Sequence, residues 1–126
     1  MDKPVSTLMT TPVKTVSAND TVEEVGEAMS RHDLVFAPVV DSLGGTVLGI
    51  ISASDLLQFQ ASKRDPKSVQ AWEICTYKPI EVSPDEPLAE VARQMVARRI
   101  HHVIVMQDQQ IKGVVSSLDF VKQFIR

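Results

Sequence analysis

A serine followed three residues later by an aspartate occurs twice in this sequence, each time directly after a short apolar run. The first copy pairs Ser52 with Asp55, and the second pairs Ser116 with Asp119. A serine hydroxyl can donate a hydrogen bond to phosphate, and a carboxylate can accept hydrogen bonds from the 2′- and 3′-hydroxyls of a ribose. Where such a serine begins a helix, the free backbone N–H groups of the first turn also favour an anion. Both pairs are therefore candidates for binding a nucleotide.

The same pattern has a second interpretation that needs no ligand. Ser-x-x-Asp is typical of a helix capping box, in which the two side chains satisfy the first N–H groups of a helix. A second copy does not separate the interpretations, because a duplication copies helix caps together with binding residues. Both hypotheses stay open from the motif alone.

The two copies belong to an internal repeat that covers almost the whole chain. A displacement of 66 residues aligns Thr10 with Thr76 in the first half of each repeat, and a displacement of 64 aligns the two Ser-x-x-Asp motifs. The change falls at residues 41–45, a predicted hairpin loop, and loops are where a change of length is expected.

Each repeat predicts the same order of elements, β-α-β-β-α. A short apolar lead precedes an amphipathic helix, which begins after a capping box at residues 20–23 in the first repeat and with Pro87 at the first helical position in the second. Apolar, β-branched runs then predict two paired strands and a short final helix. The expected ranges are 35–40 with 46–51 and 102–106 with 110–115 for the strands, and Ala53–Gln60 and Ser117–Phe124 for the final helices.

The repeats also predict the domain organisation. We expect a first repeat at residues 1–60, a linker at 61–72 with a helical turn near 69–72, and a second repeat at 73–126. Neither half is long enough to bury an adequate core alone. The expected fold is α+β, with two β-α-β-β-α repeats packed sheet to sheet around a pseudo-twofold axis.

Composition excludes several classes of protein. The chain has 126 residues, 44% of them hydrophobic and 23% charged, with a net charge of −3, as in an ordinary globular domain. It has no run of about 18 apolar residues and no visible secretory signal, and its one cysteine, Cys75, cannot form an internal disulfide, so a cytoplasmic location is expected. A pI of 5.5 argues against general binding of nucleic acid.

Charge is unevenly distributed between the two halves. Residues 1–63 carry four basic and eight acidic residues, a net charge of −4, whereas residues 64–126 carry nine basic and eight acidic residues, a net charge of +1. An anion is therefore expected to draw on the second half.

The order, spacing and duplication of these motifs resemble a tandem pair of CBS domains, the regulatory unit also called a Bateman module. The segments that carry the resemblance are the two Gly-h-h-Ser-x-x-Asp motifs (h, apolar) at 49–55 and 113–119, and residues 8–13, 37–41 and 100–105. The resemblance implies two clefts between the repeats, pairing of modules into a homodimer, an adenosyl ligand such as AMP, ADP, ATP or S-adenosylmethionine, and control of a partner protein.

The resemblance also implies which residues form each cleft. In the first cleft, Ser116 supplies the hydroxyl and Asp119 binds the ribose, while Thr10 and the backbone groups of Val35 and Phe36, which read the adenine edge, complete the site.

The second cleft follows by the same correspondence. Ser52 and Asp55 take the equivalent roles, and Thr76, His101 and His102 complete the site. The two histidines fall where the family often places basic residues that face phosphate, and residues 98–99 add two arginines nearby.

No metal site and no catalytic site are predicted. His101 and His102 are adjacent on a predicted strand, so their side chains point to opposite faces, and Cys75 has no second thiol nearby. A Mg²⁺ ion carried by nucleotide phosphates is compatible with the sequence. A Gly-x-Ser-x-Gly elbow and a long phosphate loop are both missing, so the chain is not expected to be an enzyme.

The leading hypothesis is a regulatory module that senses adenine nucleotide and acts on a partner protein through a ligand-induced conformational change. The first alternative is a ligand-free module for dimerisation or protein interaction. The second alternative is a sensor of S-adenosylmethionine or another adenosyl ligand. Binding of nucleic acid or membrane is not expected.

Overall fold

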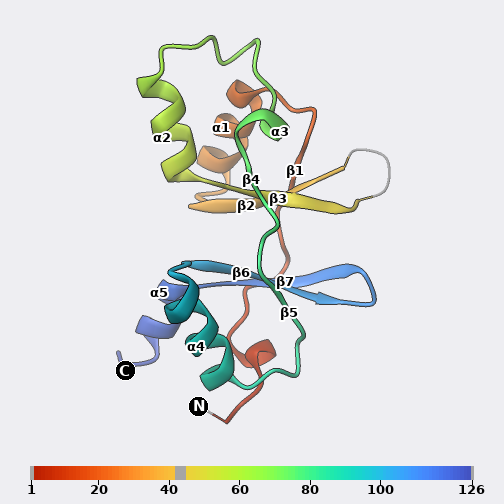
Figure 1. Ribbon diagram of the computed structural model, residues 1–126, viewed down its shortest axis with the longest axis vertical. Coiled ribbons are helices and arrows are strands. Elements are labelled where there is room, and N and C mark those ends of the chain that lie inside the picture. Colours follow the sequence, from red (N-terminus) through yellow and green to blue (C-terminus); the bar gives the residue numbers. More distant parts are fainter. Residues whose placement is uncertain (1, 42–44, 126) are drawn as a thin grey trace. The chain divides into compact units, whose positions relative to one another are not determined.

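The chain folds into two compact units in this computed structural model, which describes residues 2–41 and 45–125 (Figure 1). Unit 2 is the continuous segment Lys14–Pro79, and unit 1 combines Met1–Val13 with Ile80–Arg126. Each unit has its own β-sheet, and the helices of each unit lie on one face of that sheet. The expected α+β class is therefore confirmed.

Unit 2 contains a four-stranded sheet of order β1-β2-β3-β4. β1 runs parallel to β2, whereas β2 with β3 and β3 with β4 are antiparallel. The strands are β1 (Val16–Ser17), β2 (Phe36–Val40), β3 (Val47–Ser52) and β4 (Thr76–Tyr77), and the helices are α1 (Val22–Arg31), α2 (Ala53–Ala61) and α3 (Ala71–Ile74).

Unit 1 repeats the arrangement with a three-stranded sheet of order β5-β6-β7. β5 is parallel to β6, and β6 is antiparallel to β7. The elements are the 3₁₀ turn η1 (Val5–Thr7), β5 (Glu81–Val82), α4 (Leu88–Arg98), β6 (His102–Gln107), β7 (Gln110–Ser116) and α5 (Ser117–Lys122).

Each unit has its own apolar core between sheet and helices. In unit 2, Val25 and Met29 of α1 pack with Val39 of β2 and Ile51 of β3. In unit 1, the core is formed by the equivalent positions of α4, β6 and β7, namely Val91, Met95, Val105 and Val115. This equivalence explains why the apolar positions of the two repeats coincide in the sequence.

The segments that lead into each repeat pack with the other repeat. Thr10 lies before the first predicted strand, but it forms an antiparallel bridge with Val114 of β7. Thr76 pairs in the same way with Ile50 of β3. The compact units therefore divide the chain differently from the sequence repeats expected at 1–60, 61–72 and 73–126.

Several local expectations need correction. The capping box of α1 joins Thr21 and Glu24, while Asp20 accepts a hydrogen bond from the backbone N–H of Ser17 at 2.9 Å. Pro87 is the N-cap of α4 and not its first helical residue. The final helix of unit 1 ends at Lys122 and not at residue 124.

Two other features bear on the sequence expectations. The helix α3 begins at the end of the expected linker and continues beyond it to Ile74, slightly later than the helical turn expected near 69–72. Part of the predicted hairpin loop, residues 42–44, lies outside the described residues. Among the helices that are described, none has the length and apolar character needed to cross a membrane.

Candidate functional site

The first Ser-Asp pair lies where β3 ends and α2 begins. The Ser52 Oγ accepts a hydrogen bond from the Asp55 backbone N–H at 3.2 Å. The Ser52 backbone N–H and Oγ both donate to Oδ2 of Asp55, at 2.8 and 3.0 Å. The pair is a complete capping box, so the expected helix-capping role is confirmed.

The second pair, where β7 meets α5, has the same geometry. The Ser116 backbone N–H and Oγ donate to Oδ2 of Asp119 at 2.7 and 3.1 Å, and the Asp119 N–H donates to Ser116 Oγ at 3.3 Å. In both pairs the cap uses Oδ2, and the described residues donate no hydrogen bond to Oδ1. A half-buried carboxylate that retains one uncommitted oxygen can accept hydrogen bonds from ligand hydroxyls while it caps a helix.

A threonine lies beside each pair, on a neighbouring segment. It pairs with the strand residue two positions before the serine. Thr10 exchanges backbone hydrogen bonds with Val114, at 2.8 Å from its N–H and 3.3 Å to its carbonyl. Thr76 is in register with Ile50 in the equivalent place. Both threonines are exposed. Each unit thus brings together the serine, aspartate and threonine that the sequence predicted as one group.

The glycine of each motif permits this close approach. A Cβ on Gly49 would overlap the backbone carbonyl of Thr76, so any larger residue would displace β4. A Cβ on Gly113 would lie 2.6 Å from the Sδ, 2.7 Å from the Cγ and 2.9 Å from the Cβ of Met9, so its nearest neighbours belong to a side chain and not to the backbone. In the sequence these glycines belong only to the repeated motif, whereas in the fold they make room for the threonine segment.

Val35 and Phe36, which the family resemblance implies for adenine, lie in unit 2 with the first Ser-Asp pair. The side chain of Val35 is 62% exposed, while Phe36 is buried and in register with Ser52. The Val35 carbonyl accepts a hydrogen bond from the backbone N–H of Ala53 at 2.8 Å, so it is already engaged within the unit. Recognition of an adenine edge by these groups stays a prediction.

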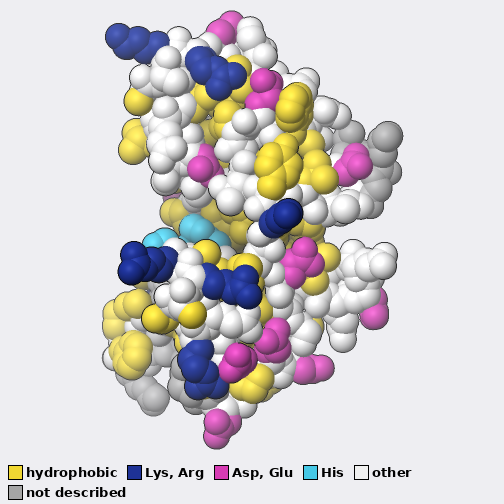
Figure 2. Space-filling view, viewed as in Figure 1, with side chains coloured by type: hydrophobic (Ala, Val, Ile, Leu, Met, Phe, Trp, Pro, Cys, Tyr) yellow, Lys and Arg dark blue, Asp and Glu magenta, His cyan; other side chains and the backbone are white. Residues whose placement is uncertain are grey.

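His101 and His102 occupy the corresponding positions of unit 1. His101 is exposed, and its carbonyl accepts a hydrogen bond from Ser117 N–H at 2.8 Å. His102 is half-buried and in register with Ser116. Lysine or arginine side chains and histidine side chains gather on this surface near the start of β6 (Figure 2).

A pocket of about 350 Å³ opens beside His101 in unit 1. Its polar groups belong to Arg99, His101 and Ser117, and Ser117 Oγ lies 3.5 Å from Nδ1 of His101. Met95, Val96 and Ile100 form the apolar wall. Sequence reasoning did not name Ser117 as a candidate, although aligning the repeats would have shown that a serine there replaces Ala53.

The two predicted clefts each combine residues of both units. The structure groups Ser52, Asp55, Thr76, Val35 and Phe36 in unit 2. It groups the remaining candidates in unit 1, which are Thr10, His101, His102, Ser116 and Asp119. The assignment of Val35 to the cleft of Ser116, and of His101 to the cleft of Ser52, stays a prediction.

Cys75 lies beside the first set, next to Thr76. Burial raises the pKa of the Cys75 thiol, and desolvation also raises the pKa of Tyr77. The Tyr77 hydroxyl donates to the carbonyl of Trp72, and the Cys75 thiol lies 3.8 Å from the same oxygen. In the part of the chain that the structure describes, no three His, Cys, Asp or Glu side chains are grouped to hold a metal ion.

Comparisons with known proteins agree on one family. The family model for the CBS domain matches residues 5–62 and 71–126. The CBS domain pair of protein MJ0100, solved in complex with 5′-methylthioadenosine and S-adenosyl-L-methionine, is 28% identical with a TM-score of 0.85, and the match covers 96% of this chain and 98% of that one.

The chain matches most of one curated relative and a small part of another. The uncharacterized protein YlbB of Bacillus subtilis is 28% identical over 86% of this chain and 74% of its own length. The L-aspartate semialdehyde sulfurtransferase of Methanocaldococcus jannaschii is 29% identical over 95% of this chain, but the match covers 23% of that protein. The chain thus spans only a minor part of the sulfurtransferase.

Proposed function

Since this chain belongs to the CBS domain family, with two CBS domains in tandem, we propose that it is a regulatory module that binds an adenine nucleotide, AMP, ADP or ATP. One observation carries the proposal. Each unit places a serine, a threonine and a carboxylate with an uncommitted oxygen at the same strand–helix junction.

The chemistry of this group suits an adenosyl ligand. The free Oδ1 of Asp55 or Asp119 would accept hydrogen bonds from ribose hydroxyls, and the hydroxyl of the neighbouring Thr76 or Thr10 would donate to phosphate or to a ring nitrogen. The 5′-methylthioadenosine and S-adenosyl-L-methionine held by the MJ0100 domain pair both contain an adenosyl group, which supports this ligand class.

Regulation requires only binding and no reaction of the ligand. A ligand that binds one conformation of the module more tightly shifts the population toward that conformation, and a partner protein that contacts the module responds. No catalytic step is part of the proposal. A Mg²⁺ ion would bind only with the phosphates of the nucleotide. The cytoplasm remains the predicted location.

The complete capping boxes also support the first alternative, a ligand-free interaction module. In that case Asp55 and Asp119 serve only the helices. The second alternative is a sensor of S-adenosylmethionine, which the ligands of the MJ0100 domain pair favour.

Thermal unfolding with and without ligand tests these alternatives. Wild-type protein would be scanned with AMP, ATP, S-adenosylmethionine and 5′-methylthioadenosine, each in large excess. A ligand at 100 times its Kd adds about 2.7 kcal/mol, a rise in Tm of several degrees. Failure of every one of these compounds to raise the Tm would refute the proposal and favour the ligand-free module.

A matched pair of variants separates capping from binding. Asp119→Asn removes the carboxylate at a candidate site, and Glu24→Gln makes the same kind of change at the N3 position of the α1 capping box. Asp119→Asn should lower stability by at most about 1 kcal/mol and Glu24→Gln should lower it as well, because each weakens one cap. Only Asp119→Asn should also reduce the ligand-induced rise in Tm. Equal ligand responses in the two variants would refute a binding role for Asp119.

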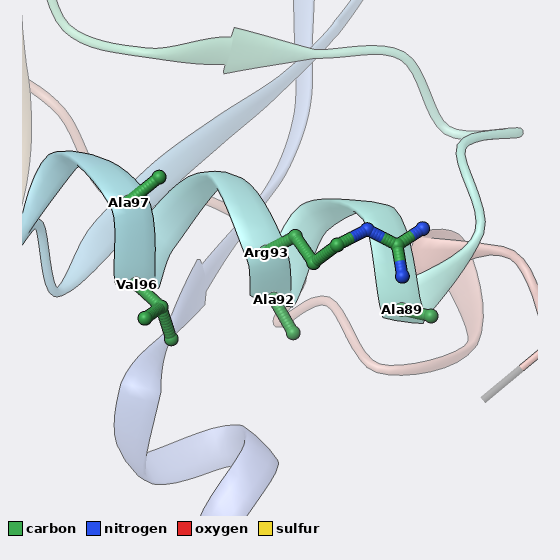
Figure 3. Close-up of a pocket in the computed structure, with 5 residues that line it drawn as sticks. All are labelled: Ala89, Ala92, Arg93, Val96 and Ala97. Atoms are coloured by element: carbon green, nitrogen blue, oxygen red, sulfur yellow. The ribbon is translucent and has the colours of Figure 1, made fainter.

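A homodimer is part of the proposal, and apolar side chains exposed on unit 1 support it. The outer face of α4 carries a shallow pocket lined by Ala89, Ala92, Arg93, Val96 and Ala97 (Figure 3). Val96 is 78% exposed, and Leu118 and Val121 of α5 are also exposed. Val96→Glu should convert the dimer to monomer in analytical ultracentrifugation, whereas Gln123→Glu should not. A wild-type protein that sediments as a monomer would refute this part of the proposal.

A further inference from the structure

The helices of the two units differ in the chemistry of their outer faces. In unit 1, α4, α5 and the turn after α5 expose four apolar side chains, between 49% and 88% exposed, which are Val96, Leu118, Val121 and Phe124. The repeat displacements of 66 and 64 give their equivalents in unit 2, which are Ser30, Ser54, Leu57 and Gln60. Three of these four equivalents are polar, so the duplicated surface is mainly apolar in unit 1 only.

The outer side of α4 is open. Its shallow pocket is lined by α4 residues alone, and Ala89, Ala92 and Val96 project from the same side of the helix (Figure 3). Val96 and Ser117, the first residue of α5, line a second pocket together, so the start of α5 adjoins α4 here. We call the exposed surface of α4, α5 and residues 123–125 the unit 1 face.

The equivalent surface of unit 2, on α1 and α2, is acidic and partly covered. α1 carries Glu23 and Glu27 where α4 carries an alanine and an arginine. The Pro66 carbonyl accepts a hydrogen bond from the Glu23 N–H at 3.1 Å, and Arg64 and Pro66 line a pocket with α1 and α2. The chain's own linker therefore covers part of a surface whose counterpart in unit 1 is open.

Charge and area both fit a second copy of this chain on the unit 1 face. Arg93 pairs with Glu90 of the same helix at 2.9 Å, so this pair adds no net charge to the face. Two α1 helices placed against each other would instead bring four glutamates together, and like charges repel. The apolar side chains of the unit 1 face expose roughly a few hundred Å², enough to mark an interaction surface. A standard interface buries about 800 Å² of each partner.

From this contrast we infer that the homodimer forms through unit 1 alone, with the unit 1 faces of two copies packed together around a twofold axis. A head-to-tail dimer would place Val96 against the carboxylates of α1, which would lose their hydration. The inference rests on the homodimer of the proposed function, and it adds that the helical face of unit 2 remains outside the interface.

Sedimentation velocity of the full chain tests the inference with a matched pair of lysine variants. Val121 and Leu57 are equivalent in the repeat, and Leu57 is the more exposed of the two, at 68% against 49%. Val121→Lys should raise the dimer Kd about tenfold or more, because a buried ammonium loses its hydration. Leu57→Lys should leave the Kd unchanged. Circular dichroism of both variants would check that the fold is preserved.

Cross-linking gives the orientation of the two copies. Ser30→Cys and Val96→Cys place a thiol at equivalent exposed positions, and wild-type protein, whose Cys75 is buried, is the control. A short flexible bismaleimide should link Val96→Cys into a covalent dimer and should leave Ser30→Cys monomeric on a denaturing gel. A mixture of the two variants should give no link between them.

The opposing results separate this inference from the homodimer itself. Equal weakening by the two lysines, no cross-link in Val96→Cys, or cross-linking that equals it in Ser30→Cys would overturn the inference and leave the homodimer intact. A covalent product that appears only when the cysteine variants are mixed would show a head-to-tail dimer, which also overturns it. Wild-type protein that sediments as a monomer would overturn the homodimer and the inference together.

Discussion

Replacing the two motif glycines by alanine should have unequal effects, although the glycines are equivalent in the repeat. In Gly49→Ala the new methyl group meets the backbone of Thr76, with the carbonyl carbon at 3.0 Å and the Cys75 Sγ at 3.1 Å. In Gly113→Ala it meets the side chain of Met9. A side chain can change rotamer, whereas the backbone of β4 can move only by losing its pairing with β3.

These contacts set the expected magnitudes. Overpacking against a fixed neighbour costs about 1–3 kcal/mol. Alanine in place of glycine recovers about 0.5–1 kcal/mol, because the unfolded chain loses conformational freedom. The difference spans about 0–2.5 kcal/mol, and Gly49→Ala should lower the free energy of unfolding by an amount near the upper end, about 2 kcal/mol, because its nearest neighbour is backbone. Gly113→Ala should change it by less than about 1 kcal/mol once Met9 moves.

Urea denaturation gives the free energies, and a second substitution supplies the control. Met9→Ala removes the Sδ and Cγ contacts and keeps only the Cβ contact at 2.9 Å, so Gly113→Ala should cost less in that background than alone, whereas Gly49→Ala has no equivalent rescue. Gly49→Ala should also speed the reaction of Cys75 with a thiol reagent, because Cys75 is held by the same contact. Equal stability losses at both glycines, or an unchanged thiol rate, would refute this reasoning.

Three further predictions concern stability away from the ligand sites. Gln109 has a φ of 64° in the two-residue turn between β6 and β7, so Gln109→Gly should stabilise the protein by about 0.5 kcal/mol in thermal unfolding. Burial raises the pKa of the Cys75 thiol above its value in the unfolded chain. The thiol's contribution to stability is therefore complete below the unfolded pKa and falls as the pH rises above that pKa. Cys75→Ala should flatten the pH dependence of the free energy of unfolding, measured with urea, between pH 8 and 10. Hydrogen bonds with Thr21, first from its backbone and second from its side chain, lower the pKa of the Glu24 carboxyl. The stability that Glu24 contributes is therefore present above the normal carboxyl pKa and is lost as the pH falls through the lowered pKa. Glu24→Gln should reduce the acid sensitivity of the melting temperature.

Each of these predictions has its own control. Gln110→Gly, one residue later and within β7, should destabilise the protein, since strands disfavour glycine. An alkaline stability profile that is identical with and without Cys75 would contradict the assigned burial effect. A Glu24→Gln variant that keeps the full acid sensitivity would contradict the lowered pKa of the Glu24 carboxyl.

Features that depend on the local pattern of residues could be predicted from the sequence. The repeat, the order of elements and the caps at Ser52 and Ser116 follow from periodicity and from residue preferences at helix starts. The one-residue error at the α1 cap arose because Asp20, Thr21 and Glu24 offer two overlapping patterns, and the hydrogen bonds formed after folding decide between them.

What depends on pairing across long sequence separations was harder to predict. β4 is a two-residue strand without an apolar pattern, and only its pairing with β3 defines it. The pocket at Arg99 and Ser117 joins a helix end to a later helix start, a juxtaposition that no spacing along the chain reveals. Because Thr10 and Thr76 align in the repeat, family resemblance could place them beside the serines where local propensity could not.

The exchange of leading segments has a consequence for how the chain is made. Unit 2 is a continuous segment, so all of it has been synthesised once residue 79 has left the ribosome. In unit 1, by contrast, Thr10 is synthesised before the whole of unit 2, and its partner Val114 is synthesised after it. The segment that contains Thr10 therefore cannot pair with β7 until all of unit 2 has been synthesised, so unit 2 can fold before unit 1 is complete.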